Sequence, residues 1–416
     1  MESWASTQGE LMPSEHWNES RVTAHDAAAR GAAGTSALPG ADQVIAGLRA
    51  TITAPGIVSM LTPEGEFTPH PDFDLDVTAE LVRGLYRDLV LVRRADREGN
   101  ALQRQGQLGL WVPLLGQEAA QIGAGRALRP QDMVFPSYRE HAVAWCRDIR
   151  PAQVASMFRG TDYGGWDAKE RRFHKYTVVI GNQVLNAAGY AMGQRLDGML
   201  GDEASAEATV AFFGDGATAQ GDIHEAMVFA AAWNAPLVFF CQNNQWAISH
   251  PIDAVSRVPL FYRAAAYGFP GLRVDGNDVL ATLAATRWAL DECRTGNGPV
   301  MIEAFTYRMD AHTTSDDPNR YRMADETEAW KLLDPIERVK AFLARTGMGD
   351  AEFFAEVQAE ADALAAEFRS ELIAMGAPPV STMFRHVYAE PNAQLDRQLA
   401  ELESYLAGFA DAEPGR

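Results

Sequence analysis

The chain has 416 residues, of which 47% are hydrophobic, and its formal net charge is −20. So acidic a chain lacks the basic stripe that nucleic-acid binding requires, and it would be repelled by an anionic membrane surface. Its three cysteines are far apart and form no CxxC pair, which argues against a disulfide framework or a thiolate zinc site. With no signal peptide and no apolar run of about 20 residues, the sequence indicates a cytoplasmic enzyme with no membrane partner.

The N-terminal part of the chain changes character near residue 46. Residues 1–45 are rich in Ala, Gly, Ser and Glu with little periodicity, so we predict a flexible N-terminal arm. Residues 56–67, "GIVSMLTPEGEF", predict a short hairpin that turns at "PEG". A long helix is expected next, because apolar residues then recur at helical spacing. Those residues are Leu81, Leu85, Leu89 and Val92.

Beyond this helix, helical segments alternate with short apolar runs that are typical of buried strands. The runs cover residues 133–136, 177–180, 208–214, 235–242, 272–276 and 299–307. Strands that are apolar throughout and separated by helices predict an α/β fold, with a mostly parallel sheet covered by helices on both faces.

The C-terminal part of the chain is expected to be helical and then polar. Residues 333–347 and 351–376 have helical patterns, whereas residues 401–416 resemble a polar tail. We therefore predict one α/β domain over residues 46–376, followed by a C-terminal extension and tail over residues 377–416.

Two polar hinges follow neighbouring apolar runs. Gly214-Asp215-Gly216 ends one run, and Asn243-Asn244 ends the next. Ligands bind at the carboxyl ends of parallel strands, so the two loops would face one crevice if their strands are neighbours. Oxygen ligands from Asp215 and Asn244 would then suit Mg²⁺, which usually arrives bridging phosphate oxygens. The pair predicts a Mg²⁺-diphosphate ligand.

Each hinge alone is an ordinary turn, and other ligands fit the same crevice. "GDGATAQG" partly matches a dinucleotide-binding loop, but Ala219 stands where the third glycine belongs, and no G-K-[ST] follows. A nucleotide- or sugar-phosphate-binding enzyme and a non-catalytic scaffold subunit are the alternatives.

The pair of hinges resembles the thiamine diphosphate motif, and its context is similar to the alpha subunit of the decarboxylating component of 2-oxo acid dehydrogenase complexes. The matching blocks are "LQRQGQLGLWVPLLGQEAAQIGAGRAL", "DMVFPSYREHAV", "NNQWAIS", "GLRVDGNDVLA", "IEAFTYRMDAHTTSDDPNRYR" and "LDPIERVKAFL". "QRQGQ", "HTTSDDP" and "NNQWAIS" favour the branched-chain type over the pyruvate type. The resemblance implies the thiamine diphosphate-binding fold.

The resemblance also implies roles for single residues. Mg²⁺ would be held by Asp215, Asn244 and the carbonyl of Trp246. His312, in "DAHTTSDDP", matches the active-site histidine of the family, and Trp111 lies near an aromatic residue beside the substrate's acyl group. The other positions that match cofactor-binding residues are Tyr138, Arg139, Ile180, Gly214, Gly216, Ala217 and Ile248.

Ile180 matches the bulky residue that bends the cofactor. Gln242 stands where branched-chain relatives can carry Arg, and this puts a phosphate contact there in doubt. Thr313 lies where eukaryotic relatives are phosphorylated, but the sequence gives no sign of such regulation.

As a member of this family, the chain would be an oxidoreductase that needs thiamine diphosphate and Mg²⁺. It would decarboxylate branched-chain 2-oxo acids, or pyruvate as the alternative, and pass the acyl group to the lipoyl group of a transacylase. The family pattern implies an α2β2 assembly in which the beta subunit supplies the activating glutamate, so we assign that role to neither Glu118 nor Glu140.

Overall fold

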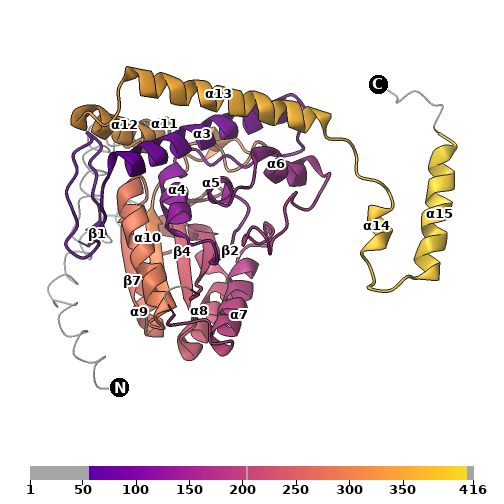
Figure 1. Ribbon diagram of the computed structural model, residues 1–416, viewed down its shortest axis with the longest axis horizontal. Helices are drawn as coiled ribbons and strands as arrows, with labels where there is room; N and C mark the ends of the chain where they lie inside the picture. Colours follow the sequence, from indigo (N-terminus) through magenta and orange to yellow (C-terminus); the bar gives the residue numbers. More distant parts are fainter. Residues whose placement is uncertain (1–55, 203–204, 410–416) are drawn as a thin grey trace, which may run out of the picture.

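A computed structural model describes residues 56–202 and 205–409 (Figure 1). Six strands form one sheet in the order β1-β7-β8-β4-β3-β2, and all neighbours run parallel. Their bounds are Ile57–Val58 (β1), Met133–Phe135 (β2), Thr209–Gly214 (β3), Leu237–Asn243 (β4), Gly271–Asp275 (β7) and Val300–Phe305 (β8). The predicted parallel α/β fold is confirmed, whereas the predicted arm over residues 1–45 lies outside the described residues.

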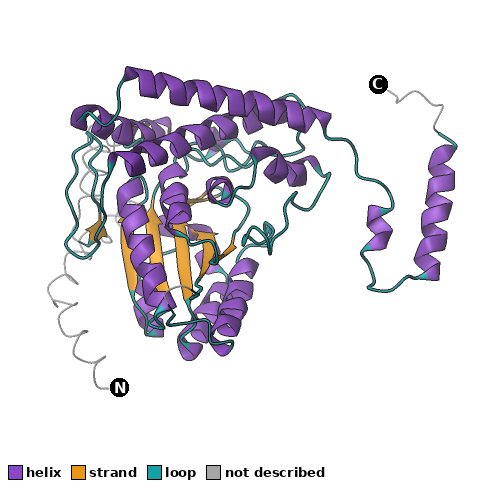
Figure 2. Cartoon of the chain, viewed as in Figure 1, coloured by secondary structure: helices purple, strands orange, loops and turns teal. Residues whose placement is uncertain are grey.

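The central strands are apolar throughout because helices cover both faces of the sheet (Figure 2). In β3, Val210 and Phe212 point into one core, and Ala211 and Phe213 point into the other. The first core is closed by α3 (Ala79–Arg104), α4 (Glu118–Ala127), α5 (His141–Cys146), α6 (Pro151–Arg159), α10 (Val279–Arg294), α12 (Pro335–Thr346) and α13 (Ala351–Ala374). The second is closed by α7 (Asn182–Leu196), α8 (Gly221–Trp233) and α9 (Tyr262–Tyr267).

Smaller elements complete the edge of the sheet where the strands end. A two-stranded antiparallel ribbon joins β5 (Trp246–Ala247) to β6 (His250–Pro251). Single 3-10 turns lie at η1 (Asp215–Ala219), η2 (Ile252–Ala254) and η3 (Pro318–Arg320), and α11 (Ala324–Lys331) follows the last of these. None of the described helices is both long and apolar enough to cross a membrane.

The prediction of a strand at residues 177–180 is wrong. This run is a loop, and Val178 and Val179 are 63% and 70% exposed. The hairpin prediction is partly right, because Leu61 pairs with Phe67 in an isolated antiparallel bridge closed by a turn. Ile57 and Val58 instead form the edge strand β1, which pairs with β7.

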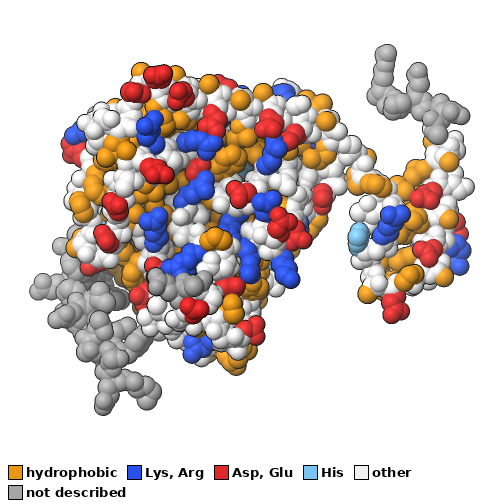
Figure 3. All heavy atoms as spheres, viewed as in Figure 1, with side chains coloured by type: hydrophobic (Ala, Val, Ile, Leu, Met, Phe, Trp, Pro, Cys, Tyr) orange, Lys and Arg blue, Asp and Glu red, His pale blue; other side chains and the backbone are white. Residues whose placement is uncertain are grey.

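The C-terminal segment is more helical than the sequence suggested. The helix predicted from residue 351 is α13, which lies across α3. Beyond it, α14 (Thr382–Arg385) and α15 (Ala393–Ala407) stand clear of the body in Figure 1 and Figure 3, and no residue in either helix is buried. The expected polar tail is therefore a helix up to Ala407.

Candidate active site

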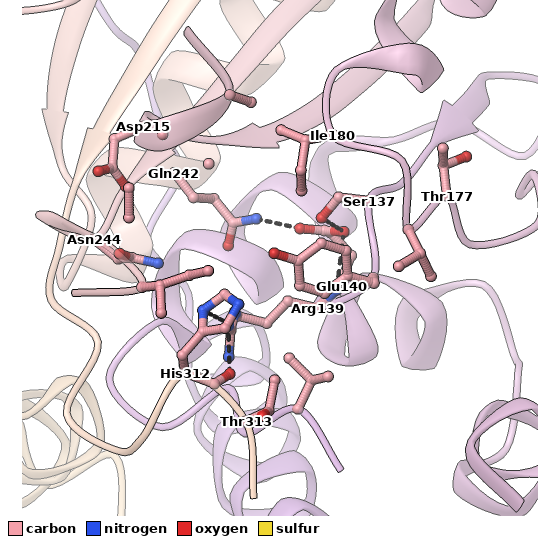
Figure 4. A pocket seen from close by; sticks show the side chains of 18 of the residues that line it. Ser137, Arg139, Glu140, Thr177, Ile180, Asp215, Gln242, Asn244, His312 and Thr313 are labelled. Carbon is pink, nitrogen blue, oxygen red and sulfur yellow. Dashed lines mark hydrogen bonds between the residues drawn. The ribbon is translucent and has the colours of Figure 1, made fainter. Parts of the chain in front are cut away.

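A cavity of about 420 Å³ opens at the carboxyl ends of β2, β3 and β4 (Figure 4). The strand register brings these ends together, because Phe135 pairs with Ala211 and Gly214 pairs with Gln242. The residues just beyond each strand therefore share one crevice, as the sequence predicted. Asp215 and Asn244 lie on the same side of it in Figure 4.

Asp215 and Asn244 form a buried pair of oxygen donors. Asp215 is 1% exposed, and burial raises its pKa to about 6, although the nearby backbone N–H of Asn244 opposes this shift. Its Oδ2 atom has no hydrogen-bond partner. The Asn244 side chain is fixed on both sides, since Nδ2 donates to Gln117 Oε1 (3.1 Å) and Oδ1 accepts from the Trp246 N–H (3.2 Å). An orphaned carboxylate oxygen beside an oriented amide oxygen fits a magnesium ion.

The backbone beside this pair leaves no room for a side chain. A Cβ atom on Gly216 would lie 2.6 Å from the Cβ of Ala247, so only glycine fits between η1 and β5. Gly216 and Ala217 line the cavity at the start of η1, where the first amides of a helical turn lack partners within the helix, and such amides suit a phosphate group. Among the described residues, no cluster of three or more His, Cys, Asp or Glu could hold a metal ion, so a metal here would depend on amide and carbonyl oxygens.

Two buried guanidinium groups place positive charge beside the cavity, and one of them, Arg139, lines it. Arg139 donates to the carbonyls of Pro113 and His312, and Arg308 donates to the carbonyls of Trp246 (3.1 Å) and Ile248 (2.8 Å). Neither arginine forms an ion pair with a carboxylate in the described part of the chain. Burial lowers the pKa of both, and that of Arg308 falls to about 10, helped by repulsion from Arg139. An anionic ligand would supply the missing countercharge.

The same two arginines keep the His312 imidazole neutral and leave its Nε2–H as a hydrogen-bond donor. Its Nδ1 atom accepts from Arg139 Nη2 (3.1 Å) and Arg308 Nη1 (3.3 Å), so the ring proton belongs on Nε2. Burial and the two cationic neighbours lower its pKa to about 3. The backbone N–H of His312 donates to Asp316 (2.8 Å), which fixes the loop. His312 can therefore offer an N–H to a ligand at neutral pH.

The cavity brings together all eleven residues predicted to bind the cofactor. The Tyr138 ring meets His312 edge-on, with 6.1 Å between the ring centroids. The full set is Tyr138, Arg139, Ile180, Gly214, Asp215, Gly216, Ala217, Asn244, Trp246, Ile248 and His312.

Trp111 does not line this cavity. Its indole Nε1 donates to the buried Asp96 (2.9 Å), and its ring lies against Phe368 of α13. Side chains alternate along the extended segment that carries it, so Leu110 and Val112 face the cavity instead. The structure therefore does not place Trp111 in the cavity, contrary to its predicted position beside the substrate.

Gln242 is fully engaged within the protein. Its Nε2 donates to Glu140 (2.6 Å), and its Oε1 accepts from Gln121 (3.0 Å), as Figure 4 shows in part. Both polar ends of the Gln242 amide are thus already hydrogen-bonded inside the protein. Positive charge beside the cavity comes from Arg139, which the sequence predicted, and from Arg308, which sequence reasoning missed although it stands four residues before His312.

Comparisons with known proteins identify the family to which the chain belongs. Residues 86–371 match the family described as "Dehydrogenase E1 component". The chain is 43% identical over 352 residues to 3-methyl-2-oxobutanoate dehydrogenase subunit alpha of Mycobacterium tuberculosis strain H37Rv, covering 84% of this chain and 94% of the relative. It is 38% identical over 332 residues to pyruvate dehydrogenase E1 component subunit alpha of Acholeplasma laidlawii (79% and 94%). It is 32% identical over 350 residues to 2-oxoisovalerate dehydrogenase subunit alpha 2 of Arabidopsis thaliana (82% and 73%). The chain belongs to the dehydrogenase E1 component family, whose members depend on thiamine diphosphate.

Proposed function

We propose that this chain is the alpha subunit of a thiamine diphosphate-dependent dehydrogenase that acts on branched-chain 2-oxo acids such as 3-methyl-2-oxobutanoate. The observation that carries the proposal is the cavity, which is lined by an orphaned Asp215 oxygen and by Arg139, a buried arginine that forms no ion pair in the described part of the chain. The 43% identity to a relative named for this substrate supports the branched-chain type. Pyruvate is the alternative substrate, supported by the 38% identity to a pyruvate-type relative.

The cofactor would be held at its diphosphate end. Asp215, the Asn244 side chain and the Trp246 carbonyl would hold Mg²⁺; that carbonyl already accepts from Arg308 and keeps a second lone pair. Arg139 would face the diphosphate as a charged donor, and Arg308 would add its positive charge from behind the cavity wall. Ile180, which is 40% exposed at the cavity wall, would support the cofactor rings.

Thiamine diphosphate, when bound, supplies the carbon nucleophile and the electron sink for loss of carbon dioxide. The chain's part is to position it and to stabilise charge. His312, neutral and protonated on Nε2, would donate a hydrogen bond to the substrate's developing oxygen charge. The acyl carbon is oxidised as the lipoyl disulfide of the transacylase is reduced and takes the acyl group.

The site needs a second chain. Val178 and Ile248 line the cavity, and Val179 follows Val178 in the chain, yet all three are more than half exposed, which supports an apolar partner surface there. We propose that this partner is the beta subunit in an α2β2 assembly, that it brings the activating glutamate, and that the complex is cytoplasmic.

Cofactor binding tests the proposal directly. The complex with the beta subunit should bind thiamine diphosphate with Mg²⁺ by calorimetry and decarboxylate 3-methyl-2-oxobutanoate faster than pyruvate. Asp215→Ala should abolish both binding and turnover, because the metal loses its only carboxylate from this chain. Asp253→Ala, at an exposed position on η2 outside the cavity, is the matched control and should behave as wild type. Wild-type activity in Asp215→Ala would refute the metal assignment, and tight binding of a nucleotide in place of the cofactor would refute the function.

A further inference from the structure

The cavity has two chemically different ends. Asp215 and Asn244 lie on one side in Figure 4, and Thr177 lies on the opposite side. The wall near Thr177 is apolar and is built from Leu110, Val112, Phe158 and Val178. A ligand whose charged tail occupies the first end would present its reactive part toward the second.

Backbone contacts hold the apolar wall beside the histidine loop. The Trp111 N–H donates to Thr314 Oγ1, and the Thr314 N–H donates to the Trp111 carbonyl, both at 3.0 Å. The segment that carries Leu110 and Val112 therefore lies against the loop that carries His312. The Gly109 N–H donates to the Phe158 carbonyl (3.0 Å), so the end of α6 is fastened to the same segment.

Phe158 is the least movable part of this wall. Its ring lies 5.4 Å from Trp111, 5.9 Å from His141 and 6.4 Å from Tyr176, measured between centroids. His141 and Tyr176 are themselves joined by a hydrogen bond of 2.8 Å. Three large rings thus pack against Phe158, which also lines the cavity. A ligand therefore cannot displace the Phe158 ring without disturbing a packed core.

We propose that Phe158 closes the acyl end of the cavity and sets the upper limit on the side chain of the 2-oxo acid. The inference rests on the proposed function and adds the residue that selects among its substrates. Branched aliphatic side chains fill the space between Leu110, Val112 and Phe158, whereas an aromatic side chain meets the Phe158 ring. A group as small as one methylene changes selection by roughly 10- to 200-fold in a pocket of this kind.

The test measures kcat/KM on a graded series of 2-oxo acids, using the complex with its beta subunit and an artificial electron acceptor. The series is pyruvate, 3-methyl-2-oxobutanoate, 4-methyl-2-oxopentanoate and phenylpyruvate. Phe158→Ala should raise kcat/KM for phenylpyruvate relative to 3-methyl-2-oxobutanoate by about tenfold or more. Phe158→Trp should lower kcat/KM for 4-methyl-2-oxopentanoate relative to kcat/KM for pyruvate by a similar factor. This second variant keeps the test decisive if Phe158→Ala does not fold.

Phe173 offers a matched control. Its ring packs 6.0 Å from the same Tyr176, but it is fully buried and does not line the cavity. Phe173→Leu should lower stability and leave the substrate ratios unchanged. Wild-type ratios in the folded Phe158 variants would overturn the inference and leave the proposed function standing. A wild-type complex inactive on every acid in the series would overturn the proposed function itself.

Discussion

His141 shows how a single side chain packed inside the protein lowers the free energy of unfolding in acid. Its Nε2 lies 2.9 Å from the Val112 carbonyl, which can only accept, so Nε2 carries the proton and Nδ1 accepts from the Tyr176 hydroxyl. Burial, with a smaller contribution from the charge of Arg139, lowers its pKa to about 3. The ring is therefore neutral in the folded state well below the pH at which it would be protonated in an unfolded chain.

This arrangement predicts a loss of stability in acid. Between pH 6.5 and about 3 the unfolded chain binds a proton at residue 141 that the folded chain does not, so the free energy of unfolding falls as pH falls. Each such group contributes a slope of about 1.4 kcal/mol per pH unit. Denaturant titrations at pH 7, 6 and 5 measure the free energy of unfolding of wild type and His141→Gln. As pH falls, this free energy should fall less steeply in His141→Gln than in wild type, and the difference in slope should correspond to about one proton. Equal slopes would contradict this account.

At the scale of elements, helix α3 carries two glycines in opposite environments. A Cβ atom on Gly99 would collide with the Trp111 indole, whereas a Cβ atom on Gly84 would meet nothing within 4 Å. Gly99 therefore allows α3 to approach the segment that lines the cavity. At Gly84, in contrast, no packing contact requires a glycine.

The two glycines form a matched pair for a stability measurement. Gly84→Ala should raise the free energy of unfolding by about 0.5–1 kcal/mol, because alanine is the better helix former. Gly99→Ala should lower it by about 1–3 kcal/mol or more through overpacking, and it should lower kcat/KM by shifting Leu110 and Val112. Thermal and denaturant unfolding measure both effects, and the same sign for both variants would rule out the packing argument.

The sequence predicted the central strands because a parallel strand covered on both faces has to be apolar, as in β3 and β4. The same rule failed at residues 177–180, where the apolar side chains line a cavity mouth. One chain cannot reveal whether an apolar run is buried by its own helices or by a partner. The short strand β1 was missed because two residues carry too little pattern.

The site was predictable where it depended on strand ends, as for Asp215 and Asn244. It was less so where it depended on which way a side chain points. Trp111 and Leu110 are adjacent, and only the backbone conformation decides which of them faces the cavity. Arg308 was missed because an arginine after a strand is usually exposed, whereas this one is fully buried.

At the scale of the whole molecule, apolar side chains around the cavity mouth predict where the beta subunit binds. Val179→Lys should weaken association with the beta subunit by about tenfold or more, because a charge would be buried in an apolar contact. Ile373→Lys, at a position that is 52% exposed on α13, is the control and should leave assembly intact. Size-exclusion chromatography of the co-expressed subunits measures both, and normal assembly of Val179→Lys would place the interface elsewhere.

The two arginines without acidic partners have a consequence for how the protein persists in a cell. Arg139 and Arg308 repel each other inside the fold, and neither forms an ion pair with a carboxylate among the described residues. The doubly charged diphosphate group of the cofactor would remove that repulsion when it binds. Its binding free energy would therefore add to the free energy of unfolding by mass action. We expect the supply of thiamine diphosphate to govern how long the folded polypeptide resists heat and proteolysis, and not only how fast it catalyses its reaction.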